Sequence, residues 1–298
     1  MRILVTGASG HVGGAIAEQL AAEGHHVVGL SRSRGPSPAV AEWMLADLAA
    51  DAEHELAPAS GEACDAIVHA AAAIAHHPHA PEVSLVNCLG TQRVVALAER
   101  WRVRSLVYIS SVHTIGTPRL LPITEDHPVD PPTAYHASKI YGERLVELAR
   151  RRGTAAATLR ITSPVGPGMP DGRILSVWVR RALAGEPLDL AGEGGRRQDY
   201  VDVRDVAAGV AASLRRGASG SFNVASGRAV SNRELAQLVL EVCESSSPVR
   251  PTGRPDPDEH LSWEVSLERA AAAFGYVPRH DVRDSIEAVA ADVRRGGR

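Results

Sequence analysis

The first half of the chain alternates short apolar runs with longer amphipathic stretches, and this alternation restricts the possible folds more than any other feature. The runs at 2–7, 25–31, 65–72 and 105–111 are typical of strands, and those at 15–24 and 92–101 are typical of helices. Strands that alternate with helices predict βαβ units, in which a parallel sheet carries helices on both faces. The pattern therefore predicts an α/β fold built on a doubly wound parallel sheet.

The second half of the chain is less regular, because three of its stretches are rich in Gly, Pro and charged residues. They lie at 163–172, 191–198 and 245–259. Such clusters usually form loops. We therefore expect a Rossmann-type dinucleotide-binding domain made of 1–163 and 199–225. A smaller α/β substrate-binding region would take 164–198 and 226–298.

Composition excludes several classes of partner. The chain has 32 Lys and Arg against 35 Asp and Glu, so no basic field favours a nucleic acid or an anionic membrane. Cys64, Cys88 and Cys243 have neither metal-ligand nor paired spacing, and we expect no metal and a reducing compartment. No apolar run reaches the length of a membrane span and no signal peptide is visible, so we expect a cytoplasmic protein.

Glycines follow the first apolar run directly. Gly7, Gly10 and Gly13 form the pattern T-G-x-x-G-x-x-G between the expected first strand and first helix. In that place glycines let the amides at the helix N-terminus approach a pyrophosphate. A tight turn without a ligand would use the same residues, but the position within a βαβ rhythm favours a dinucleotide site.

The end of the second expected strand bears on the choice of dinucleotide. A carboxylate there would bind the ribose hydroxyls of NAD, whereas a cation would accept the extra phosphate of NADP. The chain has Ser31, Arg32 and Arg34 at this point. Arg32, helped by the Ser31 hydroxyl, predicts a preference for NADP(H), with NAD(H) possible. A solvated arginine on a surface loop is the competing interpretation.

Candidate catalytic groups stand near the middle of the chain. Tyr135 and Lys139 are four residues apart, so on a helix they share a face. A neighbouring ammonium lowers the pKa of a phenol, and this predicts that Tyr135 exchanges protons with a substrate. Ser110 and Ser111 end an apolar strand at the sheet edge where such folds bind ligands.

These residues belong to a longer series of motifs. The series comprises TGASGHVG, LADL, VHAAA, NCLGTQRVV, ISS, YHASK, QDYVDVRDVAAGV, FNVASGRAVSNRELA and AAAFGYVPR. In these motifs and their order the chain resembles the extended short-chain dehydrogenases/reductases of the NAD-dependent epimerase/dehydratase family. The resemblance covers nearly the whole chain.

The resemblance implies a role for each matching position. Ser111, Tyr135 and Lys139 would be catalytic: Tyr135 as acid/base, Lys139 on the nicotinamide ribose, and Ser111 bonded to the reacting oxygen. The cofactor-binding residues would be Gly7, Ser9, Gly10, His11, Val12, Gly13, Ser31, Arg32, Asp47, Leu48, His69, Ala70, Ala71, Asn87, Tyr135 and Lys139. The resemblance also implies a homodimer, built from the helices that carry NCLGTQRVVALAER and YHASKIYGERLVELA.

Departures from the family pattern concern the substrate. Relatives that dehydrate sugar nucleotides follow the active hydroxyl with Asp-Glu, whereas this chain has Val112 and His113, so that dehydration is not expected. His113 would contact substrate, act as an auxiliary proton residue, or only shape the loop. Ser163 and Gln198 replace the family's usual asparagine and arginine.

The neighbouring Arg197 could compensate for Gln198 only if the loop shifts. The expected substrate-binding residues are therefore Ser111, His113, Ser163 and Arg197. Weakened diphosphate recognition leaves open both a nucleotide-linked sugar and a substrate without a diphosphate.

The leading functional prediction is an NAD(P)-dependent oxidoreductase that reduces a ketone of a sugar nucleotide or specialised metabolite with NADPH. Its substrate would be a small carbonyl compound or alcohol. The alternative is an NAD-dependent sugar-nucleotide epimerase, which oxidises and re-reduces one molecule. A dinucleotide sensor without catalysis is a third possibility, but it would not need Ser111, Tyr135 and Lys139 together.

Overall fold

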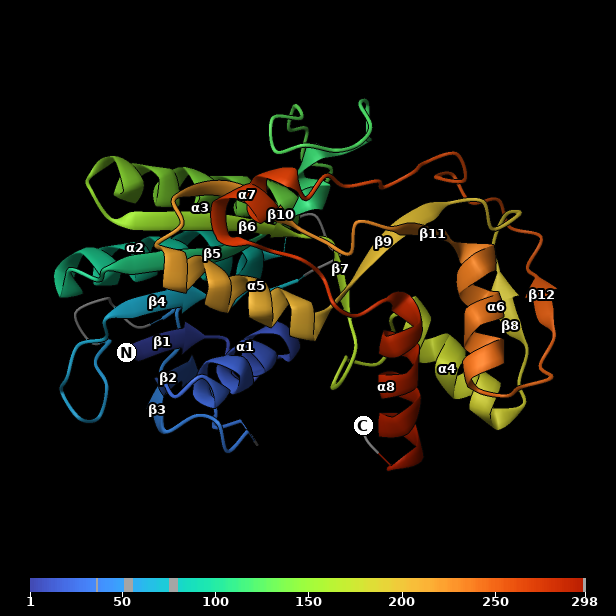
Figure 1. The fold of residues 1–298 in the computed structure, drawn as a ribbon, viewed down its shortest axis with the longest axis horizontal. Helices are drawn as coiled ribbons and strands as arrows, with labels where there is room; N and C mark the ends of the chain where they lie inside the picture. The colour runs from blue at the N-terminus through green and yellow to red at the C-terminus, as the bar shows by residue number, and fades with distance from the viewer. Residues whose placement is uncertain (36, 51–55, 75–79, 297–298) are drawn as a thin grey trace.

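The computed structural model describes residues 1–35, 37–50, 56–74 and 80–296. Figure 1 shows a central sheet with helices on both faces, and a smaller group of helices and strands beside it. Among the described residues, no helix combines the length and the apolar character needed to cross a membrane.

The central sheet is parallel throughout. In the described part of the chain it has seven strands in the order β10-β6-β5-β4-β1-β2-β3. Their bounds are β1 (Arg2–Thr6), β2 (His26–Ser31), β3 (Glu42–Leu45), β4 (Ala66–His69), β5 (Ser105–Ser111), β6 (Ala155–Ile161) and β10 (Gly220–Val224). The predicted doubly wound parallel sheet is confirmed.

Helices cover the sheet on both faces, as the amphipathic stretches predict. Helices α1 (His11–Ala22) and α5 (Val203–Arg216) pack on one face, where Ile16 and Val210 are fully buried. On the other face lie η1 (Val83–Leu89), α2 (Gly90–Trp101) and α3 (Ala134–Arg151), with Leu97 among their buried residues. Gly24, which follows α1, has a φ of +80° and lets the chain turn into β2.

The order of the strands creates a crevice. Strands β1 and β4 are neighbours, but the chain leaves β1 toward α1 on one face and leaves β4 toward η1 on the other. Open α/β sheets bind ligands at such a switch point, beyond the carboxyl ends of the strands. Thr6, His69 and Ser111 end three of these strands along that edge.

The smaller group has a core of its own. Its helices are α4 (Ile174–Ala184), α6 (Asn232–Val242) and α8 (Val282–Arg294). Its strands are β7 (Ser163–Val165), β8 (Leu188–Leu190), β9 (Arg197–Asp202), β11 (Ala229–Ser231) and β12 (Val249–Pro251). Leu175, Trp178, Leu235 and Ile286 are buried together there, so Trp178 packs in this core.

The division into 1–163 with 199–225 and 164–198 with 226–298 remains a proposal. Most elements of the second set build the smaller group, as Figure 1 shows. Helix α7 (Glu268–Phe274) is an exception. Its Ala270 and Phe274 are buried in the core that α1 and α5 form against the central sheet.

Candidate active site

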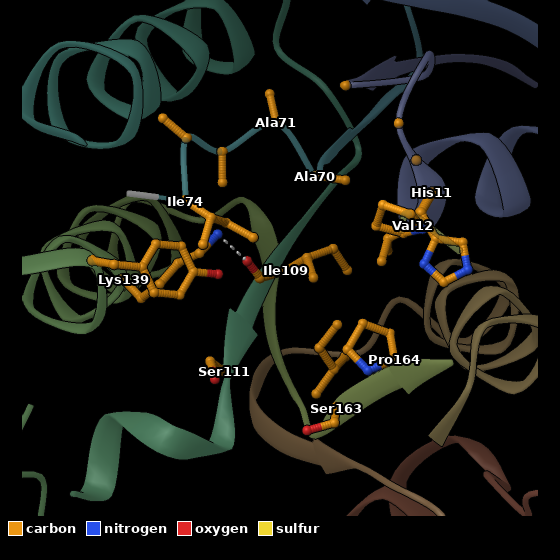
Figure 2. A pocket seen from close by; sticks show the side chains of 18 of the residues that line it. His11, Val12, Ala70, Ala71, Ile74, Ile109, Ser111, Lys139, Ser163 and Pro164 are labelled. Carbon is orange, nitrogen blue, oxygen red and sulfur yellow. Dashed lines mark hydrogen bonds between the residues drawn. The ribbon is translucent and has the colours of Figure 1, made fainter. Parts of the chain in front are cut away.

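A cavity of about 960 Å³ lies between the carboxyl edge of the sheet and the smaller group. Its wall begins at the glycine-rich loop and runs past the ends of β4 and β5 to β7 and β9. Figure 2 shows His11 and Val12 on one side, Ala70 and Ala71 above, and Ser111 and Ser163 at the far end. The cavity thus joins most of the residues that the sequence singled out.

The glycine loop leaves backbone open toward this cavity. A Cβ on Gly13 would lie 2.1 Å from the carbonyl oxygen of Gly7, and Gly7 itself has a φ of +70°. Helix α1 begins at His11 with Gly10 as its N-cap, and no described side chain caps it. Backbone amides at a helix N-terminus bind phosphate when no side chain intervenes. These residues therefore fit a dinucleotide pyrophosphate.

The end of β2 supplies the residues expected to meet the adenosine. Arg32, Asp47 and Leu48 line the cavity, and the Arg32 side chain is exposed. The Ser31 hydroxyl donates to the carbonyl oxygen of Ser33 at 2.5 Å, so its proton is already engaged. Arg32 is the cation at this end of the cavity wall among the described residues.

His69 does not reach the cavity, contrary to the implied cofactor contact. Its side chain is 1% exposed, and its two ring nitrogens bond Thr6 Oγ1 at 2.7 Å and Thr91 Oγ1 at 2.9 Å. Thr91 donates its own hydroxyl proton to the carbonyl oxygen of Asn87. His69 Nε2 must therefore donate to Thr91, which leaves Nδ1 to accept from Thr6.

This assignment makes His69 a neutral link in a buried chain of hydrogen bonds. The Thr6 oxygen in turn accepts from the Ala71 amide at 3.1 Å, so the chain holds the end of β4 against the end of β1. Burial lowers the pKa of His69 to about 3, in keeping with the neutral form. His69 supports the cavity wall from behind.

Asn87 likewise supports the wall and is not part of it. It is 1% exposed, and its amide exchanges hydrogen bonds with both backbone groups of Ala73 at 2.7 and 2.9 Å. It also donates to Ser138 Oγ at 3.0 Å. Asn87 thereby connects the segment after β4, which borders the cavity at Ala71, to the helix that carries Tyr135.

The three expected catalytic residues, Ser111, Tyr135 and Lys139, all reach the cavity. All three line it, Ser111 from the end of β5 and the other two from the first turns of α3. Lys139 is fully buried and its Nζ donates to the carbonyl oxygen of Ile109 at 2.9 Å, as Figure 2 shows. The same nitrogen lies 5.7 Å from the centre of the Tyr135 ring.

The charges at these residues differ from one expectation. Burial raises the pKa of Tyr135 to about 12, so the net shift is opposite to the lowering expected from a neighbouring lysine. Burial of the phenol is the main cause, and the nearby ammonium donates its hydrogen bond to Ile109. Burial also lowers the pKa of Lys139 to about 8. Near neutral pH the phenol is protonated and the lysine carries most of its charge.

The far end of the cavity is lined by imidazoles and small polar groups. His113 lies 4.1 Å from Trp263 between ring centres, and its Nδ1 is 3.5 Å from Ser111 Oγ. His136 faces His113 at 6.2 Å. Burial lowers the pKa of His113 to about 4, so the ring is neutral. Ser163 lines the cavity from β7, as expected.

Arg197 turns away from the cavity, which corrects its expected role. It donates to Glu234 at 3.0 Å and to the carbonyl oxygen of Ala229 at 2.6 Å. Strand residues alternate between faces, so Gln198 and Tyr200 face the cavity where Arg197 cannot. No loop shift brings the arginine in.

Several residues that line the cavity were not expected from the sequence, and Arg173, Ile74 and His136 are among them. Arg173, the N-cap of α4, extends into the wall near Tyr135, whose pKa its charge lowers. Ile74 and His136 also line the cavity. The only signal in the sequence was the position of Arg173 just before an apolar helix, a pattern common to many surface arginines.

Comparison with known proteins gives consistent matches. Residues 3–225 match the model of the NAD dependent epimerase/dehydratase family. A UDP-glucose 4-epimerase of Mycolicibacterium smegmatis is 34% identical over 254 residues, 79% of this chain and 80% of the relative. A dTDP-6-deoxy-L-talose 4-dehydrogenase (NAD(P)(+)) of Kitasatospora kifunensis is 28% identical, covering 96% of this chain and 93% of the relative.

A solved structure extends the match to three dimensions. MoeE5 in complex with UDP-glucuronic acid and NAD superposes with a TM-score of 0.87 at 25% identity, covering 99% of this chain and 100% of that one.

Proposed function

Because the chain belongs to the NAD dependent epimerase/dehydratase family, we propose that it is an NAD-dependent epimerase of nucleoside diphosphate sugars. It would oxidise one hydroxyl-bearing carbon of the sugar and reduce it again on the other face. The M. smegmatis relative is named for such a reaction, and MoeE5 binds both a UDP-sugar and NAD. This reading replaces ketone reduction as the leading one.

One observation carries the proposal. Ser111, Tyr135 and Lys139 line the same cavity as the glycine loop. A dinucleotide seated on Gly7, Gly10 and Gly13 could therefore extend to these groups. A sensor would need only the first half of this arrangement, so the non-catalytic alternative is disfavoured.

The chain would hold NAD through residues that the structure already brings together. The glycine loop would bind the pyrophosphate, Asp47 and Leu48 the adenosine, and Lys139 the nicotinamide ribose. When bound, NAD supplies a carbon that accepts a hydride and gives it back. The residues of the chain must then move one proton at the reacting oxygen.

Tyr135 would perform that proton transfer. Its oxygen takes the proton of the sugar hydroxyl as the ketone forms and returns it when the alcohol re-forms. Since burial raises the pKa of Tyr135 to about 12, the tyrosinate needs a nearby positive charge, which Lys139 provides. The Ser111 hydroxyl would donate a hydrogen bond to the carbonyl oxygen.

The substrate end would be held by residues of the smaller group. Arg173 offers a cation for a phosphate, and the neutral rings of His113 and His136 offer hydrogen bonds to sugar hydroxyls. Ser163 and Gln198 add neutral polar contacts.

NADPH-dependent ketone reduction is the second candidate. It is favoured by Arg32, an exposed cation on the cavity wall at the adenosine end. The K. kifunensis relative is named as a dehydrogenase that uses NAD(P)(+), so its name includes both NAD and NADP.

We also propose a homodimer. Tyr141 and Leu148 are exposed apolar residues two turns apart on α3, and Leu85 of η1 is exposed nearby in the same layer. A partner helix pair would cover them.

The test identifies the bound cofactor and follows the reaction. Protein purified from the cell is denatured, the released nucleotide is identified by mass spectrometry, and UDP-glucose and UDP-glucuronic acid are followed by proton NMR. We expect stoichiometric NAD and interconversion of 4-epimers. Tyr135→Phe should keep the nucleotide and lose about 10²–10⁴-fold in rate.

Each other outcome has a meaning. An empty protein that prefers NADPH over NADH and consumes it with a keto sugar would establish the reductase instead. Turnover that survives Tyr135→Phe undiminished would contradict both candidates.

A further inference from the structure

A buried ion pair stands directly behind the proposed catalytic groups and has no part in the scheme above. Glu143 lies on α3, one turn after Lys139, and Arg160 lies on β6. Their side chains are 9% and 8% exposed. Arg160 donates through Nε to Glu143 Oε1 at 2.9 Å and through a terminal nitrogen to Oε2 at 2.7 Å.

The carboxylate has a second partner, at the end of β5. Ser110 Oγ donates to Glu143 Oε1 at 2.6 Å, and Ser110 is also paired with Arg160 in the parallel register. Its neighbours are engaged too, since Ile109 accepts from Lys139 and Ser111 faces the cavity. Of the last three residues of β5, the first bonds Lys139, the second bonds Glu143 and the third lines the cavity.

Stability alone is a weak reason for such a pair. Removing two charges from water is costly, and apolar residues of similar volume often stabilise a core as well or better. Glu143 lies four residues after Lys139 on α3. An effect of the pair on that lysine therefore explains its burial better than stability does.

Lys139 is the only lysine in the chain, and all other cationic side chains are arginine. An ammonium changes its pKa readily on burial, whereas a guanidinium does not. Burial lowers the pKa of Lys139 to about 8, and Glu143 is the neighbour whose charge raises it. Among the described residues, the titratable and charged groups that face this lysine are Tyr135, His136 and Glu143 of α3, Tyr108 of β5, His69 of β4 and, through Glu143, Arg160 of β6.

We propose that Glu143 and Arg160 are positioning residues: Glu143 keeps Lys139 charged, and Arg160 with Ser110 holds that carboxylate and the end of β5 in place. Of the groups that face Lys139, Glu143 is the carboxylate, so it offsets the cost of burying the ammonium. Arg160 weakens the effect of Glu143, because its positive charge repels that of Lys139. The importance for catalysis rests on the proposed function, since a neutral Lys139 could not stabilise a tyrosinate at Tyr135.

The single lysine allows a direct test without substrate. The full chain is labelled with [¹³Cε]-lysine, and its one lysine signal is titrated by NMR. We expect Glu143→Gln to lower the pKa of Lys139 by about one unit or more, and Arg160→Gln to raise it. Glu147→Gln is the matched control, because Glu147 lies one turn further from Lys139 along α3 and pairs with Arg150 and Arg151. It should leave the titration unchanged.

Two further variants keep the test decisive. Glu143→Gln with Arg160→Gln leaves neither buried charge unpaired, and it should still lower the pKa if the single variants do not fold. Glu143→Asp retains the charge and should titrate like the native protein. If Lys139 titrates as in the native protein in every folded variant that lacks the Glu143 carboxylate, the pair is merely structural and the proposal is wrong.

Activity gives a second, separate readout. In Glu143→Gln the alkaline limb of the kcat/KM profile should move to lower pH together with the NMR titration, with little change in KM. If the chain proves not to be an epimerase, the NMR result still stands, so failure of one proposal is distinguishable from failure of the other.

Discussion

At the scale of single residues, the cavity depends on side chains that do not touch it. The chain from Thr91 through His69 and Thr6 to the Ala71 amide holds two strand ends together, and each hydrogen bond has one possible direction. Motif matching implied that His69 contacts the cofactor. Ala70, directly after β4, lines the cavity, whereas His69 at the end of β4 points toward the helices and bonds Thr91 of α2.

This arrangement predicts a loss of stability in acid. His69 titrates near pH 6.5 when unfolded but has a pKa of about 3 when folded, so the unfolded state binds the proton first. The stabilisation is complete above pH 6.5 and is lost as the pH falls toward 3, with a slope of about 1.4 kcal/mol per pH unit for one histidine. Urea unfolding between pH 7.5 and 5 should show the decline.

Variants identify the source of that decline. His69→Gln should be less stable than the native protein at pH 7.5 but should lose less stability on acidification. His260→Gln, at an exposed histidine, should keep the native slope. An unchanged slope in His69→Gln would show that other groups carry the acid sensitivity.

At the scale of elements, α1 and α3 supply the two ends of the site through their N-terminal turns. Helix α1 presents backbone, because Gly10 caps it without a side chain. Helix α3 presents side chains, because Thr133 caps it and Tyr135 and Lys139 follow on one face. The spacing of both motifs in the sequence was sufficient to predict these faces, since local helix geometry sets them.

Adjacent glycines in α1 offer a sharp comparison. In Gly13→Ala the new Cβ would lie 2.1 Å from the Gly7 oxygen, so the glycine loop must open, and we expect dinucleotide binding to fall by 10-fold or more, about 1.4 kcal/mol. Gly14→Ala places its Cβ 3.6 Å from the nearest atom, the oxygen of Ala8, and should bind normally. Calorimetric titration with NAD measures both, and equal affinities would remove the loop from the cofactor site.

At the scale of the whole molecule, one cavity spans two groups of elements with separate cores. The central sheet supplies the glycine loop and the Ser111, Tyr135 and Lys139 side chains, and the smaller group supplies Ser163 and Arg173. Because α3 lies on the surface with apolar residues exposed, the molecule also has a face suited to self-association.

The dimer proposal is tested by mass in solution. Light scattering should give twice the chain mass, and Leu148→Arg should give the mass of one chain, because a buried guanidinium without a partner is costly. Val277→Arg, at an exposed apolar residue of another surface, should remain dimeric. A native protein with the mass of one chain would rule out the proposal.

Local patterns in the chain were sufficient to predict the parallel sheet, the glycine loop and the faces of α3, because each depends on residues a few positions apart. Folding decided the rest. Arg197 pairs with Glu234, Arg173 enters the wall, and Glu143 meets Arg160 and Ser110, and each of these contacts joins segments that only the packed structure brings together. The pKa values of Tyr135 and Lys139 belong to the same class, since burial determines them and burial is a property of the whole fold.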